Sequence, residues 1–342
     1  MPLDTNAGTT IGPLLAKLKS AGNDTGKVNI YNAISDQYYR TNDPANGSAY
    51  GQKALELAEQ LDWKKGKASA LNNLGHNYLI KFEYINALSY YDKALVLYET
   101  MGDLAGITKM YTSKGEVYYL LSQYAEAQEN YFKALKIAEK EHSAEDIAAC
   151  QINIGDIYYK ERNFPKALEY YNACVKIYTV IDDKRALAIA YRDIANIYFE
   201  EVNLVKAAEY YNKALEIAEN GHDKKNIAEN LSNLGNVYSE QQEHEKALEY
   251  AFRSLKLNRE INNKSGIANN LGNIGTTYLL IGTDPAALAK IKGPAKNNET
   301  IHLQKGIRYI NEAVTIELKL GEINTLPQFY ENLSEAYSLL GN

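Results

Sequence analysis

The sequence contains few of the residues on which several classes of protein depend. Its 342 residues include only two cysteines, Cys150 and Cys174, so neither a disulfide framework nor a four-ligand zinc cluster of cysteines is expected. Lysine and arginine number 37 against 43 aspartates and glutamates, and the net charge of −6 disfavours a basic face for nucleic acid. No apolar run approaches the roughly 18 residues that cross a bilayer. Proline, at seven residues, is rare enough to permit long helices.

Tyrosine is instead unusually frequent, with 29 residues against six phenylalanines and one tryptophan. Such an excess suggests one residue type repeated at a fixed structural position. Tyr78 does recur at a constant interval, as Tyr38, Tyr118, Tyr158, Tyr198, Tyr238 and Tyr278. Gly75, three residues before Tyr78, is small in every copy, and Ala87 and Ala94 recur twelve and nineteen residues after the glycine as small residues.

Each copy of the repeat is predicted to form two antiparallel helices. In the second copy they run over about residues 67–81 and 85–101, where apolar residues follow helical spacing. The small residues would let the two helices approach closely, and Tyr78 is expected to fill the space between units. Turn and cap signals separate the helices at Gly102-Asp103, Ser143, Asp182-Asp183, Gly221-His222-Asp223 and Asn262-Asn263. Four prolines fall where a helix would begin: Pro44, Pro165, Pro285 and Pro327.

This spacing of small residue, tyrosine and two alanines resembles the tetratricopeptide repeat. The resemblance implies an all-α fold, a right-handed superhelical solenoid of tandem helix hairpins. The period of 40 exceeds the usual value of about 34, and Leu71 or Tyr111 replaces the first signature tryptophan. The longer unit is similar to the extended repeats of kinesin light chains, Pins-type adaptors and bacterial Rap-type regulators. HEAT and armadillo units share a period near 40 but lack this spacing.

The layout predicted from the repeat has two parts. Residues 1–26 form a flexible N-terminus and a cap helix, which covers residues 11–20. Residues 27–342 form the solenoid, with units at about 27–62, 67–101, 107–141, 147–181, 187–220, 227–260 and 267–320 and a terminal helix at 325–342. The seventh unit carries an insertion at 283–302, interpreted as a surface loop with a helical turn at 286–291; a lid or docking element is the alternative.

The resemblance also implies a binding surface, because the first helix of each unit, helix A, lines the concave side of such solenoids. An asparagine recurs two residues before the small residue, and its amide can both donate to and accept from a peptide backbone. The same asparagines could instead join neighbouring helices, and the aromatic residues could pack between them. The predicted peptide-binding residues are Asn73, Asn153, Asp193, Asn233, Asn273, His76, Glu116, Asp156, Asn196, Asn236, Tyr119, Tyr159, Phe199 and Arg192.

The charge of this surface predicts the character of the partner. Acidic and aromatic residues favour a protein or extended peptide with basic residues among apolar ones. Lys109 and Arg192 alone are too few for the carboxylate clamp by which some members of the family hold a chain terminus.

Catalytic and metal-binding patterns are missing from the sequence. The five histidines, His76, His142, His222, His244 and His302, show no metal-ligand spacing, and three of them, His142, His222 and His244, are expected in exposed turns. Both cysteines are expected to be inert core thiols. No cofactor is therefore predicted, and the predicted function is a non-catalytic binding scaffold.

Three other functions remain open in the sequence. The chain could be the sensor region of a larger bacterial signalling protein, such as a histidine kinase, a cyclase or a transcription regulator, whose output domain follows residue 342. It could also be a structural spacer or self-associating scaffold, whereas a hydrolase has no residue support. No signal peptide is recognisable, so a soluble cytoplasmic protein is favoured, with the periplasm as the alternative if an export signal was trimmed.

Overall fold

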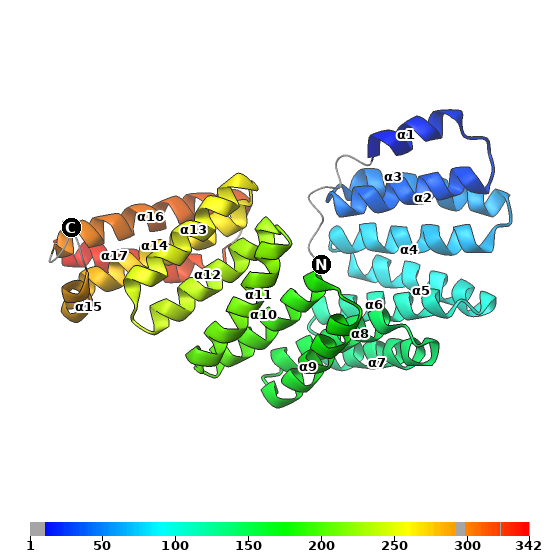
Figure 1. Ribbon diagram of the computed structural model, residues 1–342. Helices are drawn as coiled ribbons and strands as arrows, with labels where there is room; N and C mark the ends of the chain where they lie inside the picture. Colours follow the sequence, from blue (N-terminus) through cyan, green and yellow to red (C-terminus); the bar gives the residue numbers. More distant parts are fainter. Residues whose placement is uncertain (1–10, 292–297, 322, 342) are drawn as a thin grey trace. The chain divides into compact units, whose positions relative to one another are not determined.

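Residues 11–291, 298–321 and 323–341 are described in the computed structural model. These residues form α-helices joined by turns, and no β-strand occurs among them (Figure 1). The fold is a tetratricopeptide-type solenoid of tandem helix hairpins, as the repeat predicts. The chain divides into two compact units, residues 1–170 and 171–342.

The first unit contains a short helix followed by three complete hairpins and the first helix of a fourth. Its helices are α1 (Ile11–Ser20), α2 (Thr25–Arg40), α3 (Pro44–Gln60), α4 (Lys64–Ile80), α5 (Tyr84–Met101), α6 (Leu104–Leu120), α7 (Tyr124–Glu141), α8 (Ala144–Lys160) and the beginning of α9 (Phe164–Val180). Figure 1 shows α1 to α8 in succession, with each helix beside the one that precedes it.

The second unit continues the pattern and ends with a longer hairpin and one further helix. Its helices, after α9, are α10 (Lys184–Glu200), α11 (Leu204–Asn220), α12 (Lys224–Glu240), α13 (His244–Glu260), α14 (Lys264–Thr283), α15 (Pro285–Lys290), α16 (Glu299–Leu320) and α17 (Leu326–Leu339).

The turns between helices are evenly spaced, so the two halves of each repeat have equal length. Most helices have 17 or 18 residues and are joined by short turns. One residue of each turn lies in the left-handed region, at Asn42, Asp62, Phe82, Gly102, Ser122, His142, Arg162, Asp182, Val202, His222, Gln242 and Asn262. This conformation ends one helix and redirects the chain into the next.

The predicted cap residues begin the helices as expected. The side chains of Asp103, Ser143, Asp183, Asp223 and Asn263 each accept a hydrogen bond from a backbone N–H three residues later. These bonds satisfy backbone donors that the first turn of a helix leaves unpaired. The four prolines likewise occupy the first or second helical residue, which confirms the predicted starts.

The small residues of the repeat form the core, but their partner differs from the prediction. Ala87 and Ala94 are fully buried, as expected. A Cβ atom at Gly75 would lie 2.4 Å from Tyr91 Cε1, so the glycine makes room for the buried tyrosine of helix α5. Tyr78, expected to fill the space between units, has its ring partner within its own unit. It is half-buried and stacks on Tyr90 of its own hairpin, with ring centroids 5.1 Å apart.

The extra residues of the seventh repeat lengthen both of its helices and add the short helix α15 between them. Helix α14 has 20 residues and α16 has 22, whereas α15 covers most of the predicted helical turn at 286–291. Helix α1 spans the same residues as the predicted cap helix. The predicted flexible residues 1–10, and residues 292–297 of the insertion, lie outside the described residues.

Candidate functional site

The first helices of the repeats line a face in each of the two units, and we call this face of either unit the helix-A face. It consists of α2, α4, α6 and α8 in the first unit and of α10, α12, α14 and α17 in the second. Within each unit successive members contact one another, as α2 does with α4 and α12 with α14. All the predicted peptide-binding residues lie on these helices.

Asn73 is buried within the helix-A face of the first unit. Its Nδ2 atom donates to the backbone oxygen of Asn32 at 3.0 Å and to Asn32 Oδ1 at 3.3 Å. These bonds join α4 to α2, and only 7% of Asn73 is exposed. The amide of Asn73 therefore joins adjacent helices. This is the alternative to peptide binding that the sequence left open for these asparagines.

His76 is enclosed by side chains from three other helices. Its ring stacks on Tyr39 at 4.8 Å between centroids and meets the edge of Tyr91 at 5.6 Å. Its Nε2 atom lies 3.4 Å from Ser113 Oγ. Burial, with smaller effects from Lys109 and Arg40, lowers the pKa of His76 to about 3, so the imidazole is neutral and holds helices together.

Glu116 lies among aromatic residues of the same face. Burial raises the pKa of its carboxyl group above the ordinary range. Tyr39 has its pKa raised to about 12, first by burial and then by the charge of Glu116. A half-buried carboxylate beside tyrosine rings is therefore a prominent electrostatic feature of the first unit.

The predicted aromatic residues of the first unit pack against the start of the following helix. Tyr119 lies 5.8 Å from the Tyr124 ring, and Tyr159 lies 5.9 Å from the Phe164 ring. Burial and the nearby charge of Asp156 raise the pKa of Tyr119 to about 12. Both predicted rings are only half-buried, as are Asn153 and Asp156 on α8, so these side chains keep a surface for contact.

A polar pocket of about 300 Å³ lies on the second unit and brings together three predicted residues, Arg192, Asn196 and Asn233. Arg192 Nη1 donates to Glu229 Oε2 at 2.7 Å, and Arg192 also contacts Asp193 Oδ1 at 3.4 Å. Arg192 and Glu229 are the charged residues among the described residues that line the pocket, so the lining carries no net charge.

Asn233 differs from Asn73 although both occupy the same position of the repeat. It is half-buried, lines the polar pocket, and makes no hydrogen bond with its amide to another described residue. Asn196, by contrast, accepts from Tyr211 Oη at 2.6 Å. The amide of Asn233 is thus available to a ligand.

A second pocket, of about 310 Å³, brings together Phe199, Asn236 and Asn273. Asn273 Nδ2 donates to Asn236 Oδ1 at 2.8 Å, which joins α14 to α12. Glu240 and Leu280 contribute to a lining that is partly acidic and partly apolar. The helix-A face of the second unit therefore carries an amide-rich pocket and a mixed one.

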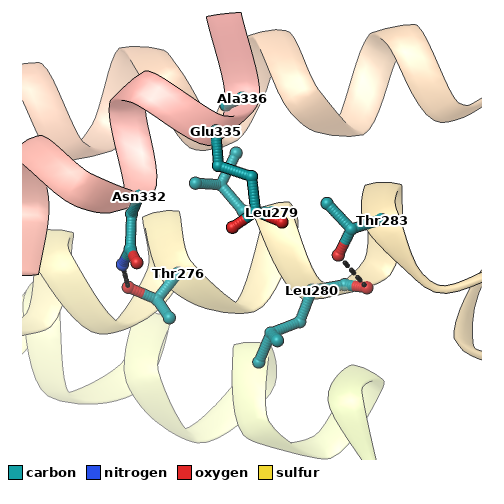
Figure 2. Close-up of a pocket in the computed structure, with 7 residues that line it drawn as sticks. All are labelled: Thr276, Leu279, Leu280, Thr283, Asn332, Glu335 and Ala336. Carbon is teal, nitrogen blue, oxygen red and sulfur yellow. Dashed lines mark hydrogen bonds between the residues drawn. The ribbon is translucent and has the colours of Figure 1, made fainter. Parts of the chain in front are cut away.

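The space between α14 and α17 is much smaller, at about 50 Å³ (Figure 2). Figure 2 shows Asn332, the last residue at the asparagine position, with its Nδ2 atom 3.3 Å from Thr276 Oγ1. Glu335 and Leu279 also line this space. It has room for a few water molecules but not for a large side chain.

The structure adds residues that the sequence analysis did not select. Glu229, Ser232 and Asn269 line the polar pocket, and each lies three or six residues before the small residue of its repeat. The repeat numbering that identified Arg192 could have found them. Phe82 follows no such rule, because it lies in a turn between two helices.

One expectation about the histidines is wrong. His142 and His222 lie in turns and are exposed, as predicted, but His244 begins α13 and is only 7% exposed. Its pKa is lowered by burial, with Asp284 and Lys290 of the insertion nearby. Residues of the insertion, a full repeat later in the chain, therefore lie near His244. The sequence around His244 alone could not indicate this proximity.

A metal site, a reactive thiol and a membrane-spanning helix each place requirements on the described residues. No group of three or more histidine, cysteine, aspartate or glutamate side chains there is arranged to hold a metal ion. Cys150 and Cys174 are buried, and burial raises the pKa of the Cys150 thiol to about 11. No helix in the described part of the chain combines the length and apolar character required to cross a membrane.

Several solved structures share this fold at low sequence identity. BtubC from P. vanneervenii is 22% identical over 63% of this chain and 91% of its own, with a TM-score of 0.57. A Rap protein complexed with Competence and Sporulation Factor is 13% identical over 99% of both chains, with a TM-score of 0.58. NprR complexed with its cognate peptide NprX is 16% identical over 97% of this chain and 91% of its own, with a TM-score of 0.52. No curated protein sequence matches the chain.

Sequence models of the tetratricopeptide repeat match residues 68–101, 106–179, 146–220 and 186–260. Together these matches cover more than half of the chain, and they coincide with the helix hairpins described above. The chain belongs to the tetratricopeptide repeat family.

Proposed function

We propose that the helix-A face binds an extended segment of a partner protein or peptide and catalyses no reaction. The observation that carries this proposal is the free amide of Asn233, which lines a pocket of about 300 Å³ beside Arg192 and Asn196. A primary amide can pair with both the N–H and the C=O of an extended backbone.

Backbone recognition alone gives weak binding. Each hydrogen bond contributes about 1 kcal/mol net, so a few of them correspond to roughly millimolar affinity. Side-chain contacts must add the rest. The mixed pocket, with Phe199, Leu280 and Glu240, suits an apolar side chain with a cation beside it.

Two of the similar solved structures support a peptide ligand. They hold Competence and Sporulation Factor on a Rap protein and the peptide NprX on NprR. Protein binding is also the general role of arrays of this family. We infer from these precedents that a solenoid of this kind can hold a segment of the partner without a catalytic group.

A peptide-display selection on the full chain tests the proposal. The informative variant is Asn233→Ala with Asn269→Ala, because neither amide makes a hydrogen bond to a described residue and the fold should persist. Asn212→Ala is the matched control, since it removes an exposed amide from the second helix of a repeat, which we call helix B.

The wild type and the control should enrich the same motif, and the double variant should lose it while keeping its circular dichroism spectrum. Equal enrichment by the double variant would remove the polar pocket from the binding surface. A selection that enriches nothing on the wild type would contradict peptide binding itself.

A further inference from the structure

An apolar pocket of about 320 Å³ lies on the first unit, at the ends of three successive helices A. Its lining includes Tyr39 from α2, Leu79 from α4 and Leu120 from α6. Phe82 and Glu116 also line it. The volume is sufficient for one large side chain, and the lining is more apolar than that of the two pockets on the second unit.

Phe82 occupies its turn at a cost to stability. Its φ of 60° lies in the left-handed region, which bulky residues rarely adopt, and 76% of the residue is exposed. Most equivalent turns carry polar residues such as Ser122 and Gln242, and Val202 is the other apolar exception. Neither the turn nor the core requires phenylalanine here. An exposed aromatic ring in a strained position beside a pocket is typical of a binding residue.

Glu116 supplies the only charge among the described residues that line this pocket. No lysine or arginine side chain of the described residues lies within ion-pair distance of its carboxylate. Lys81, the nearest lysine in sequence to the pocket, donates to Ser48 Oγ at 3.0 Å and lies over the Tyr78 ring.

The helix ends add to this negative charge. Helices α2, α4 and α6 all end at the pocket, and the C-terminus of a helix carries partial negative charge. A positive group is therefore the complement to this rim.

We propose that this pocket binds a bulky apolar side chain of a peptide segment that carries an arginine or lysine at a neighbouring position. The apolar side chain packs against Phe82 and Leu120, and the cation pairs with Glu116. A neutral apolar compound would bury the carboxylate without a partner, so a charged peptide is the better occupant. This inference rests on the proposed function and specifies the partner at one place on the helix-A face.

The test uses the full chain, a random-peptide display library, and the most enriched peptide labelled for fluorescence polarisation. Phe82→Asn should weaken binding about tenfold, as loss of an aromatic anchor does. The same change should raise the urea midpoint, because asparagine tolerates the left-handed conformation. Binding and stability then move in opposite directions, which a purely structural role for Phe82 would not produce.

Two further variants complete the design. Glu116→Gln should remove the preference for a basic residue over glutamine in the peptide while retaining the apolar preference. Ser122→Asn makes a comparable change in the equivalent turn of the next repeat, and it should leave affinity unchanged.

Unchanged affinity in Phe82→Asn, or an unchanged basic preference in Glu116→Gln, would overturn this inference. If the double variant Asn233→Ala with Asn269→Ala then fails to bind the same peptide, the proposed function stands. Only the apolar pocket is then excluded as a binding site. A wild type that enriches no peptide would overturn both.

Discussion

Two asparagines at the same position of the repeat have different surroundings. Asn73 is buried and donates to Asn32, whereas Asn233 is half-buried and faces a pocket. From the sequence, the structural and binding interpretations of this position are equally open. The structure gives the amide a partner on the preceding helix at Asn73 and none among the described residues at Asn233.

Asn73→Ala should therefore destabilise the fold, and Asn233→Ala should not. The first change removes hydrogen bonds from a buried site, which costs about 1–2 kcal/mol. The second removes an amide without a described partner and should stay within about 0.5 kcal/mol. Urea unfolding followed by circular dichroism measures both. Equal losses of stability would mean that the two amides play the same structural role.

His76 predicts how stability depends on pH. Its pKa is lowered to about 3 in the folded chain, below the ordinary value for an exposed imidazole, so the unfolded chain binds the proton more readily. The contribution of His76 is complete above the unfolded pKa and is lost as the pH falls towards 3.

Between about pH 7 and pH 5 this loss should amount to about 1–2 kcal/mol. His76→Gln, which cannot take up a proton, should show a smaller fall over the same interval. The measurement is the free energy of unfolding in urea at the two pH values. Identical pH dependence in the two proteins would assign the acid sensitivity to other groups.

At the scale of the helix pair, the glycine of the repeat is matched to a tyrosine on the opposite helix. Gly75 lies against Tyr91, and Gly115 lies against Tyr131 in the same way. In the sixth repeat Gly235 faces Ala251, and a Cβ atom there would meet nothing closer than 3.3 Å. The repeat keeps the glycine, but the need for it depends on the partner.

Gly75→Ala should destabilise by about 1–3 kcal/mol, because the new Cβ would lie 2.4 Å from a buried ring that has no space to move. Gly235→Ala should be nearly neutral, since the gain in helix propensity offsets a mild contact. Thermal unfolding of the two variants compares them directly. A larger loss at Gly235 would contradict this account of the small residue.

The high tyrosine content is also explained at this scale. In five hairpins a helix-A tyrosine lies 5.1–5.7 Å from the helix-B tyrosine twelve residues later, measured between ring centroids. In four of these a lysine or arginine lies over the second ring, at Lys53, Lys93, Lys213 and Arg253. The third hairpin has Asn130 in place of the second tyrosine and lacks the pair. Stacking and cation–π contacts of this kind stabilise each hairpin separately.

At the scale of the whole chain, the sequence predicts the order of helices better than the site. The small residue at the Gly75 position occurs in seven copies at a constant interval of 40 residues, so chance agreement is excluded. Repeat numbering locates most of the residues that line the pockets. It does not predict the placement of Phe82 in a turn, or that the amide of Asn233 has no hydrogen-bond partner among the described residues. The exposure of His244 was mispredicted because the residue is buried in the folded chain, where Asp284 and Lys290 from a later repeat lie near it.

Removal of one whole repeat tests how independent the repeats are. Deletion of residues 224–263 would join Asp223 to Lys264, so that the cap of α12 becomes the cap of α14. Since each repeat contacts mainly its neighbours, the shorter chain should fold with unchanged helicity per residue. Deletion of 224–262 leaves one extra residue in the turn and should fold less stably. Circular dichroism and urea unfolding compare the two, and equal stability would show that the register of the turns is unimportant.

The equal spacing of the turns also bears on inheritance. Because a left-handed residue ends a helix at regular intervals, a segment one repeat long begins and ends at the same structural point wherever it is cut. Recombination between misaligned copies of the gene segment would then gain or lose an intact hairpin, with its cap and its turn. The number of repeats, and with it the number of helices on the helix-A face, can therefore change in a single genetic event while every remaining helix keeps its boundaries.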